Sequence, residues 1–91
     1  MKTMTTLMTM ASELYEVNRK KLDKQTRYIV STALECGEEG HATDELLEWA
    51  IAQNVAIPET IWTGLREYYA PMTDDWGRIT QRLIAAVAHA A

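Results

Sequence analysis

The sequence predicts an all-α protein, a compact bundle of four helices in which the N-terminal helix is the longest. Apolar residues recur three and four positions apart over most of the chain, the spacing of an amphipathic helix. Alanine, leucine, glutamate and methionine are common, phenylalanine is absent, and neither glycine nor proline occurs before Gly37. With 91 residues the chain is expected to form a single domain, residues 1–91, in which residues 1–6 are loosely ordered.

The first helix is expected to run from about residue 5 to residue 36, as one long element. Gly37 and Gly40 are expected to end it, because glycine tolerates the left-handed backbone of a helix C-terminus. The positions that mark one side of this helix at helical spacing are Leu7, Ala11, Leu14 or Tyr15, Asn18, Leu22, Gln25, Ile29, Ala33 and Cys36.

Three shorter helices follow, each introduced by a capping signal. Thr43 is expected to cap a helix over residues 44–53, and Pro58 to open a third helix that stops before Pro71. Thr73 is expected to cap the fourth helix, with His89 in its last turn. The predicted core consists of Leu14, Leu22, Ile29, Leu46, Leu47, Ala50, Ile61, Trp62, Leu65, Tyr68, Trp76, Ile79, Leu83 and Val87.

The composition contains few groups that could carry chemistry. Cys36 is the only cysteine, which excludes an internal disulfide and suits a cytoplasmic protein. The two histidines and this cysteine lack the glycine-rich loops and orienting partners of familiar catalytic sites. We therefore expect no enzymatic activity, no catalytic residues, no cofactor and no metal site, and the chain has no apolar run long enough to span a membrane.

The most unusual feature is a block of acidic residues between positions 35 and 48. Six carboxylates occur in fourteen positions, with one histidine and no lysine or arginine among them. Helix capping accounts for part of this charge, but like charges at this density destabilise a compact state and would be relieved by a cationic partner. The sequence predicts a partner-binding surface made of Glu35, Glu38, Glu39, Asp44, Glu45, Glu48 and, as a half-exposed aromatic anchor, Trp49.

A basic segment precedes the acidic block and supports an alternative. Arg19, Lys20, Lys24 and Arg27 belong to a run of five cations against one acid, and three of them recur at helical spacing. This face could neutralise a few phosphates, although the net charge of −4 makes nucleic acid the less favoured partner.

The leading hypothesis from the sequence is a small cytoplasmic adaptor or inhibitor. It would dock its acidic surface on a basic patch of a larger protein, including a nucleic-acid-binding one, in the manner of small phage or plasmid inhibitors. The alternative is a DNA-associated or transcription-regulating module that uses the basic face, and a third interpretation is a homodimer joined through the long helix.

Overall fold

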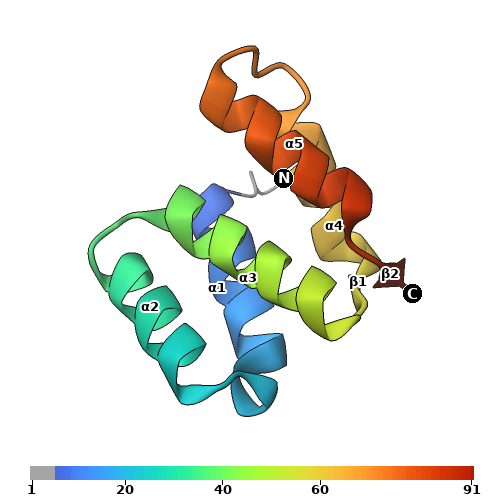
Figure 1. Ribbon diagram of the computed structural model, residues 1–91. Coiled ribbons are helices and arrows are strands. Elements are labelled where there is room, and N and C mark those ends of the chain that lie inside the picture. The colour runs from blue at the N-terminus through green and yellow to red at the C-terminus, as the bar shows by residue number, and fades with distance from the viewer. Residues whose placement is uncertain (1–5) are drawn as a thin grey trace, which may run out of the picture.

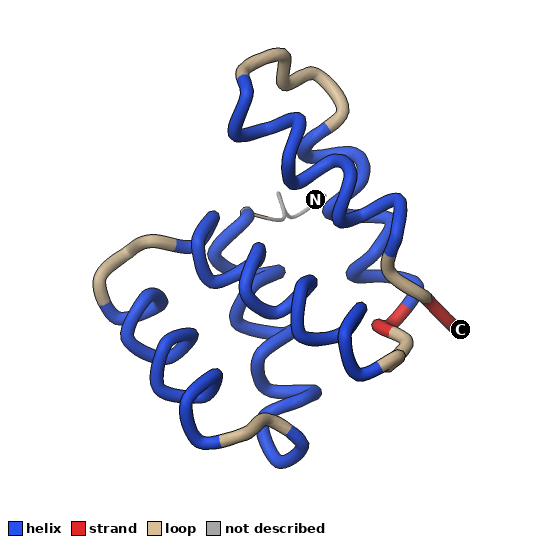
Figure 2. Tube along the Cα trace, viewed as in Figure 1, coloured by secondary structure: helices blue, strands red, loops and turns tan. Residues whose placement is uncertain are grey.

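The computed structural model describes residues 6–91 and confirms the all-α class (Figure 1). It contains five α-helices where four were predicted, together with one 3₁₀ turn and two very short strands (Figure 2). Residues 1–5, most of the segment expected to be loosely ordered, lie outside the described residues. The elements are α1 (Leu7–Asn18), η1 (Arg19–Lys21), α2 (Lys24–Glu35), α3 (Glu39–Gln53), β1 (Ile57–Pro58), α4 (Glu59–Tyr69), α5 (Asp75–Ala86) and β2 (His89–Ala90).

The prediction of one long first helix is wrong, because the chain turns between α1 and α2. Asn18 is buried at the end of α1, and its side-chain amide donates to the carbonyl of Leu14 at 3.1 Å. Asp23 then caps α2 by accepting from the backbone N–H of Thr26 at 3.0 Å and from its hydroxyl at 2.7 Å. These local side-chain bonds compete with a continuous helix, and α2 folds back beside α3.

The second predicted helix begins five residues earlier than expected, at Glu39. Gly37 has a φ of 74° and ends α2, and the next N–H, that of Glu38, donates to Ala33 at 2.8 Å. Gly40 does not end a helix but lies in the first turn of α3. Thr43 is not a cap either: it is buried inside α3, where its hydroxyl donates to the carbonyl of Glu39 at 2.8 Å.

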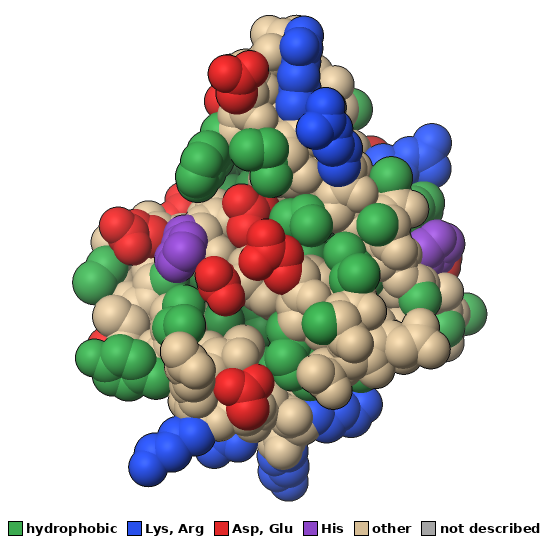
Figure 3. Space-filling model, viewed as in Figure 1, with side chains coloured by type: hydrophobic (Ala, Val, Ile, Leu, Met, Phe, Trp, Pro, Cys, Tyr) green, Lys and Arg blue, Asp and Glu red, His purple; other side chains and the backbone are tan. Residues whose placement is uncertain are grey.

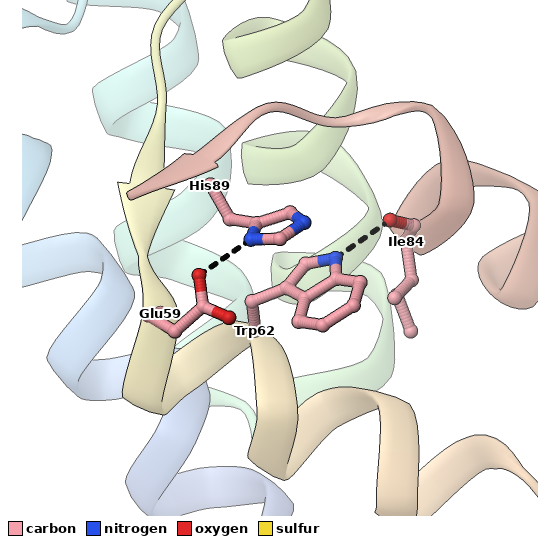
Figure 4. A network of polar contacts seen from close by, with 4 residues as sticks. All are labelled: Glu59, Trp62, Ile84 and His89. Carbon is pink, nitrogen blue, oxygen red and sulfur yellow. Dashed lines mark hydrogen bonds and ion pairs between the residues drawn. The ribbon is translucent and has the colours of Figure 1, made fainter. Parts of the chain in front are cut away.

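The C-terminal segment forms a strand pair where a helix end was predicted. The helix α5 stops at Ala86, and β2 pairs in parallel with β1, with Ile57 opposite His89. The His89 ring stacks on Trp62 at 3.7 Å, and its Nδ1 donates to a Glu59 carboxylate oxygen at 2.6 Å (Figure 4). Trp62 in turn donates its indole N–H to the carbonyl of Ile84 at 2.9 Å, so the chain end is attached to both α4 and α5.

The core is centred on α3, which packs against α1, α2 and α5, while α4 packs against α1 and α5. Most predicted core residues of α1 to α4 are buried or partly buried. Three predictions are wrong, since Tyr68, Trp76 and Ile79 are exposed. Buried residues that the prediction missed include Leu7, Met10, Val30, Ile57, Tyr69 and Ile84.

Alanine substitutions at the two glycines of the α2–α3 turn should change stability in opposite directions. Gly37→Ala should destabilise the fold by about 1 kcal/mol, because a left-handed backbone disfavours a Cβ and no atom lies within 4 Å to compensate. Gly40→Ala should be neutral or stabilise by about 0.5 kcal/mol, since alanine is the better helix former and the nearest atom, the Tyr69 hydroxyl, is 3.9 Å away. Urea unfolding followed by circular dichroism measures both, and equal losses would contradict this helix boundary.

Candidate functional site

The predicted acidic residues lie together at the α2–α3 corner and along α3. Glu35 ends α2, Glu38 precedes α3, and Glu39 is its first residue. Asp44, Glu45 and Glu48 follow on the second and third turns of α3. We call the six residues Glu35, Glu38, Glu39, Asp44, Glu45 and Glu48 the acidic surface.

The carboxylates of the acidic surface have no cationic partner within the described chain. The one ion pair found among residues 6–91 joins His89 to Glu59, which lies on α4. Figure 3 shows Asp and Glu side chains gathered over α3, with Lys and Arg side chains in two other places, at the bottom of the molecule and at the top over α5. The charge of the acidic surface is therefore not neutralised internally in the part of the chain that the structure describes.

Asp44 differs from the other five acids, because it faces α5. The hydroxyl of Thr80, which is itself buried, donates to Asp44 Oδ1 at 2.6 Å. Burial raises the pKa of Asp44 above its ordinary value, opposed by the Thr80 hydrogen bond, while the Glu48 carboxylate raises this pKa further and His41 lowers it. Burial, together with the Asp44 charge, also raises the pKa of Tyr69 to about 12, so this phenol is neutral at physiological pH. Asp44 thus serves mainly to join α3 to α5.

Trp49, predicted as the aromatic anchor of the acidic surface, is buried with only 9% of its surface exposed. The earlier start of α3 explains the error, since Ala42, Leu46 and Trp49 form one buried line at helical spacing. The most exposed aromatic of α2 is Tyr28, which is 70% exposed and directly follows Arg27. Tyr28 and Glu35 are seven residues apart in α2 and so lie on the same side of that helix.

The predicted basic residues gather at the opposite end of α2 but do not share one continuous helix. Arg19 and Lys20 lie in η1 with Lys21, whereas Lys24 and Arg27 lie in the first turn of α2. All five are exposed. The Arg27 guanidinium donates to the carbonyl of Leu22 at 3.2 Å, which holds it against the turn. We call these five residues the basic end.

The exposed side of α5 is a feature that the sequence analysis missed. The residues of α5 that point inward are Gly77, Thr80 and Ile84, whereas Trp76 remains 63% exposed and Ile79 42% exposed. A Cβ on Gly77 would lie 2.6 Å from the Cβ of Met72, so glycine is required for this approach. Gly77 and Thr80, which are small or polar and three positions apart, could have indicated the buried face of α5. The larger apolar side chains of this helix indicated a different face.

Comparisons of the chain with models of protein families, with curated protein sequences and with solved structures found no match. Among residues 6–91, no helix combines the length and the apolar character needed to cross a membrane. Over the same residues, no three His, Cys, Asp or Glu side chains are grouped so that they could hold a metal ion.

Asp44→Asn should stabilise the protein at neutral pH. A carboxyl whose pKa is raised in the folded state lowers stability above that pKa, and this cost disappears as the pH falls toward the ordinary value of 3.8. Asparagine keeps an acceptor for the Thr80 hydroxyl but has no charge. The gain, reduced because the carboxylate is only half-buried, should appear in urea unfolding at pH 7 and vanish near pH 4.

Thr80→Val provides the matched test of the same contact. Loss of the hydroxyl should destabilise the protein at pH 7 by about 1–3 kcal/mol, because Asp44 loses its donor. The loss should be smaller when Asp44→Asn is also present. An Asp44→Asn variant less stable than the unmodified protein at pH 7 would show that the charge favours the fold.

Proposed function

We infer that the protein is a small non-enzymatic interaction protein of the cytoplasm, an adaptor or inhibitor that docks on a basic patch of a larger protein. The observation that supports this most directly is the unneutralised charge of the acidic surface. Glu35, Glu38, Glu39 and Glu45 lie at one corner of the molecule, with no Lys or Arg of the described chain within ion-pair distance.

The position of these carboxylates favours docking over a purely structural role. Glu38 precedes α3 without a side-chain capping bond, and Glu45 and Glu48 lie too far into α3 to interact with the positive end of its dipole. Repulsion among them is a cost that the folded chain bears by itself. A basic partner would attract these carboxylates and so offset their mutual repulsion. Complementary charge would also speed association and discriminate between partners.

In this proposal Tyr28, and not the predicted Trp49, is the aromatic residue that contacts the partner. It is the most exposed aromatic residue among residues 6–91 and lies two helical turns from Glu35. Exposed tyrosines often act as anchors, because a large ring gives contact area at a low entropic cost. The docking surface is thus an acidic corner with an exposed aromatic residue two turns away along the same side of α2. Basic nucleic-acid-binding proteins are partners of complementary charge.

Reversing Glu38, Glu39 and Glu45 to lysine should reduce partner capture by about tenfold or more, because three attractive contacts become repulsive. The measurement is an affinity pull-down from nuclease-treated extract with mass spectrometry of the retained proteins. The matched control is Glu13, Glu16 and Glu67 to lysine, which makes the same change in net charge at exposed sites elsewhere.

Added duplex DNA should release a partner whose basic patch normally binds nucleic acid.

Glutamine at positions 38, 39 and 45 gives a milder variant that should also lose capture of the partner while its circular dichroism stays helical. Equal retention of every captured protein by the unmodified chain and by the lysine variant would contradict the proposal.

A second candidate function uses the basic end, whose five exposed cations gather at one pole of the molecule (Figure 3). Here the protein would bind nucleic acid through phosphate contacts. A DNA-binding helix-turn-helix motif built from α3 and α4 is not favoured, because α4 packs mainly against α1 and α5.

Changing Lys20, Lys24 and Arg27 to alanine should lower the slope of log affinity against log salt for a duplex by about 3, if each cation contacts a phosphate. Fluorescence anisotropy of a labelled duplex at several salt concentrations measures this slope. The control variant changes Arg66, Arg78 and Arg82 to alanine, which removes the same number of positive charges elsewhere on the surface. No salt-dependent binding by the unmodified protein would exclude this candidate.

A further inference from the structure

An apolar stripe on α5 lies between two bands of opposite charge. Trp76 and Ile79 are largely exposed, and Leu83 is partly buried beside them. At 3.6 residues per turn these three residues fall on one side of the helix. Large apolar side chains that are exposed together on a small protein indicate an interaction surface.

The acid band lies on the α3 side of the stripe. The Thr80–Asp44 hydrogen bond fixes α3 beside α5, and the two helices run in the same direction (Figure 1). Asp44 and Glu48 are four residues apart on α3 and therefore form a line parallel to the stripe.

The arginine band lies on the opposite side of the stripe. Arg78 and Arg82 are exposed and four residues apart, and on the helix they fall away from Thr80. Figure 3 shows these features on one face: Lys and Arg side chains over α5, hydrophobic side chains next to them, and Asp and Glu side chains over α3. Asp75, the first residue of α5, lies on the same side of the helix as the arginine band and is the one acid there.

We propose that this banded face of α5 and α3 binds a second copy of the same chain. In a two-fold dimer each surface meets its own copy, so a surface pairs well only if it is self-complementary. A two-fold axis parallel to α5 brings stripe against stripe and places the arginine band of each chain opposite the acid band of the other.

This arrangement also fixes the direction of the two helices. An axis along α5 gives parallel α5 helices, whereas an axis across the stripe gives antiparallel helices and places acid against acid. The charge pattern therefore selects the parallel dimer. A partner of uniform charge would be repelled by one of the two bands, which favours a second copy as the occupant.

The dimer goes beyond the proposed function and does not depend on it. Glu38, Glu39 and Glu45, which the docking test changes, are not residues of the acid band: Glu38 and Glu39 lie at the start of α3, and Glu45 lies about 100° around the helix from Asp44. A parallel dimer would cover Asp44 and Glu48 of each acidic surface and leave Glu35, Glu38, Glu39 and Glu45 of both chains for docking.

Sedimentation equilibrium of the full chain at low salt, up to about millimolar concentration, tests the proposal, because a small interface gives a weak dimer. We expect a concentration-dependent rise toward twice the monomer mass. Ile79→Glu should abolish it, and Arg82→Glu or Glu48→Arg alone should each weaken it by about tenfold. The double variant Arg82→Glu with Glu48→Arg should restore association, since the bands are exchanged.

Controls separate this dimer from other interfaces and from misfolding. Glu16→Arg and Arg66→Glu make the same charge changes on α1 and α4 and should leave the dimer unchanged. Circular dichroism verifies that each variant is folded. A monomeric mass at every concentration, or a dimer that is insensitive to Ile79→Glu and to the charge exchange, would overturn the proposal.

The orientation is tested by cross-linking. Ala86→Cys, in a Cys36→Ser background, adds one thiol on the exposed end of α5 without altering the stripe. In a parallel dimer the two thiols lie close together and a short bismaleimide links them, whereas in an antiparallel dimer they would be about 20 Å apart. Efficient linking supports the parallel arrangement, and its absence in a sample that sediments as a dimer would overturn it.

Discussion

The hydrogen bond between Thr80 and Asp44 fixes which side of α5 turns toward α3, and the character of the protein surface depends on that choice. Gly77 supports it by allowing the α4–α5 turn to approach closely, and Gln81 donates to two carbonyls of the same turn, those of Tyr69 and Met72, at 2.6 and 2.9 Å. With these polar contacts made inside, Ile84 is buried while Trp76 and Ile79 of α5 remain exposed. A stripe that would otherwise complete the core is thereby available for association.

The turn at residues 18–23 determines where the charged residues of α2 and η1 lie. Because α2 folds back, the basic end and the acidic corner lie at opposite ends of a twelve-residue helix, about 18 Å long. That separation exceeds the Debye length of about 8 Å at physiological ionic strength, so the two groups of charges are screened from each other. Each of the two groups of charges is therefore available to an external partner of opposite charge.

The sequence predicted the all-α class and several helix ends, because those depend on local features such as Gly37, Pro58 and Pro71. It also predicted which acids lie together. The α1–α2 turn was not predicted. Asp23 followed by Thr26 is a capping pattern, but the apolar spacing continues across the turn and by itself favours one helix. The orientation of α5 and the strand pair at residue 89 depend on contacts with residues 30 to 40 positions away, which periodicity does not contain.

A folded chain of ninety-one residues has little surplus stability, so exposed apolar groups and unpaired charges are significant costs. Trp76 lies one turn before Thr80 and about 40° from it around the helix, so burying Trp76 in the place of Thr80 would require α5 to rotate by roughly 40°. That rotation would break the Thr80 bond and leave Asp44 without its donor at the α3–α5 junction. It would also turn Gly77 away from Met72, where a side chain has no room. The polar and steric constraints at α3 and α5 therefore outweigh the hydrophobic gain available within one chain, and a second chain can recover that gain without disturbing them.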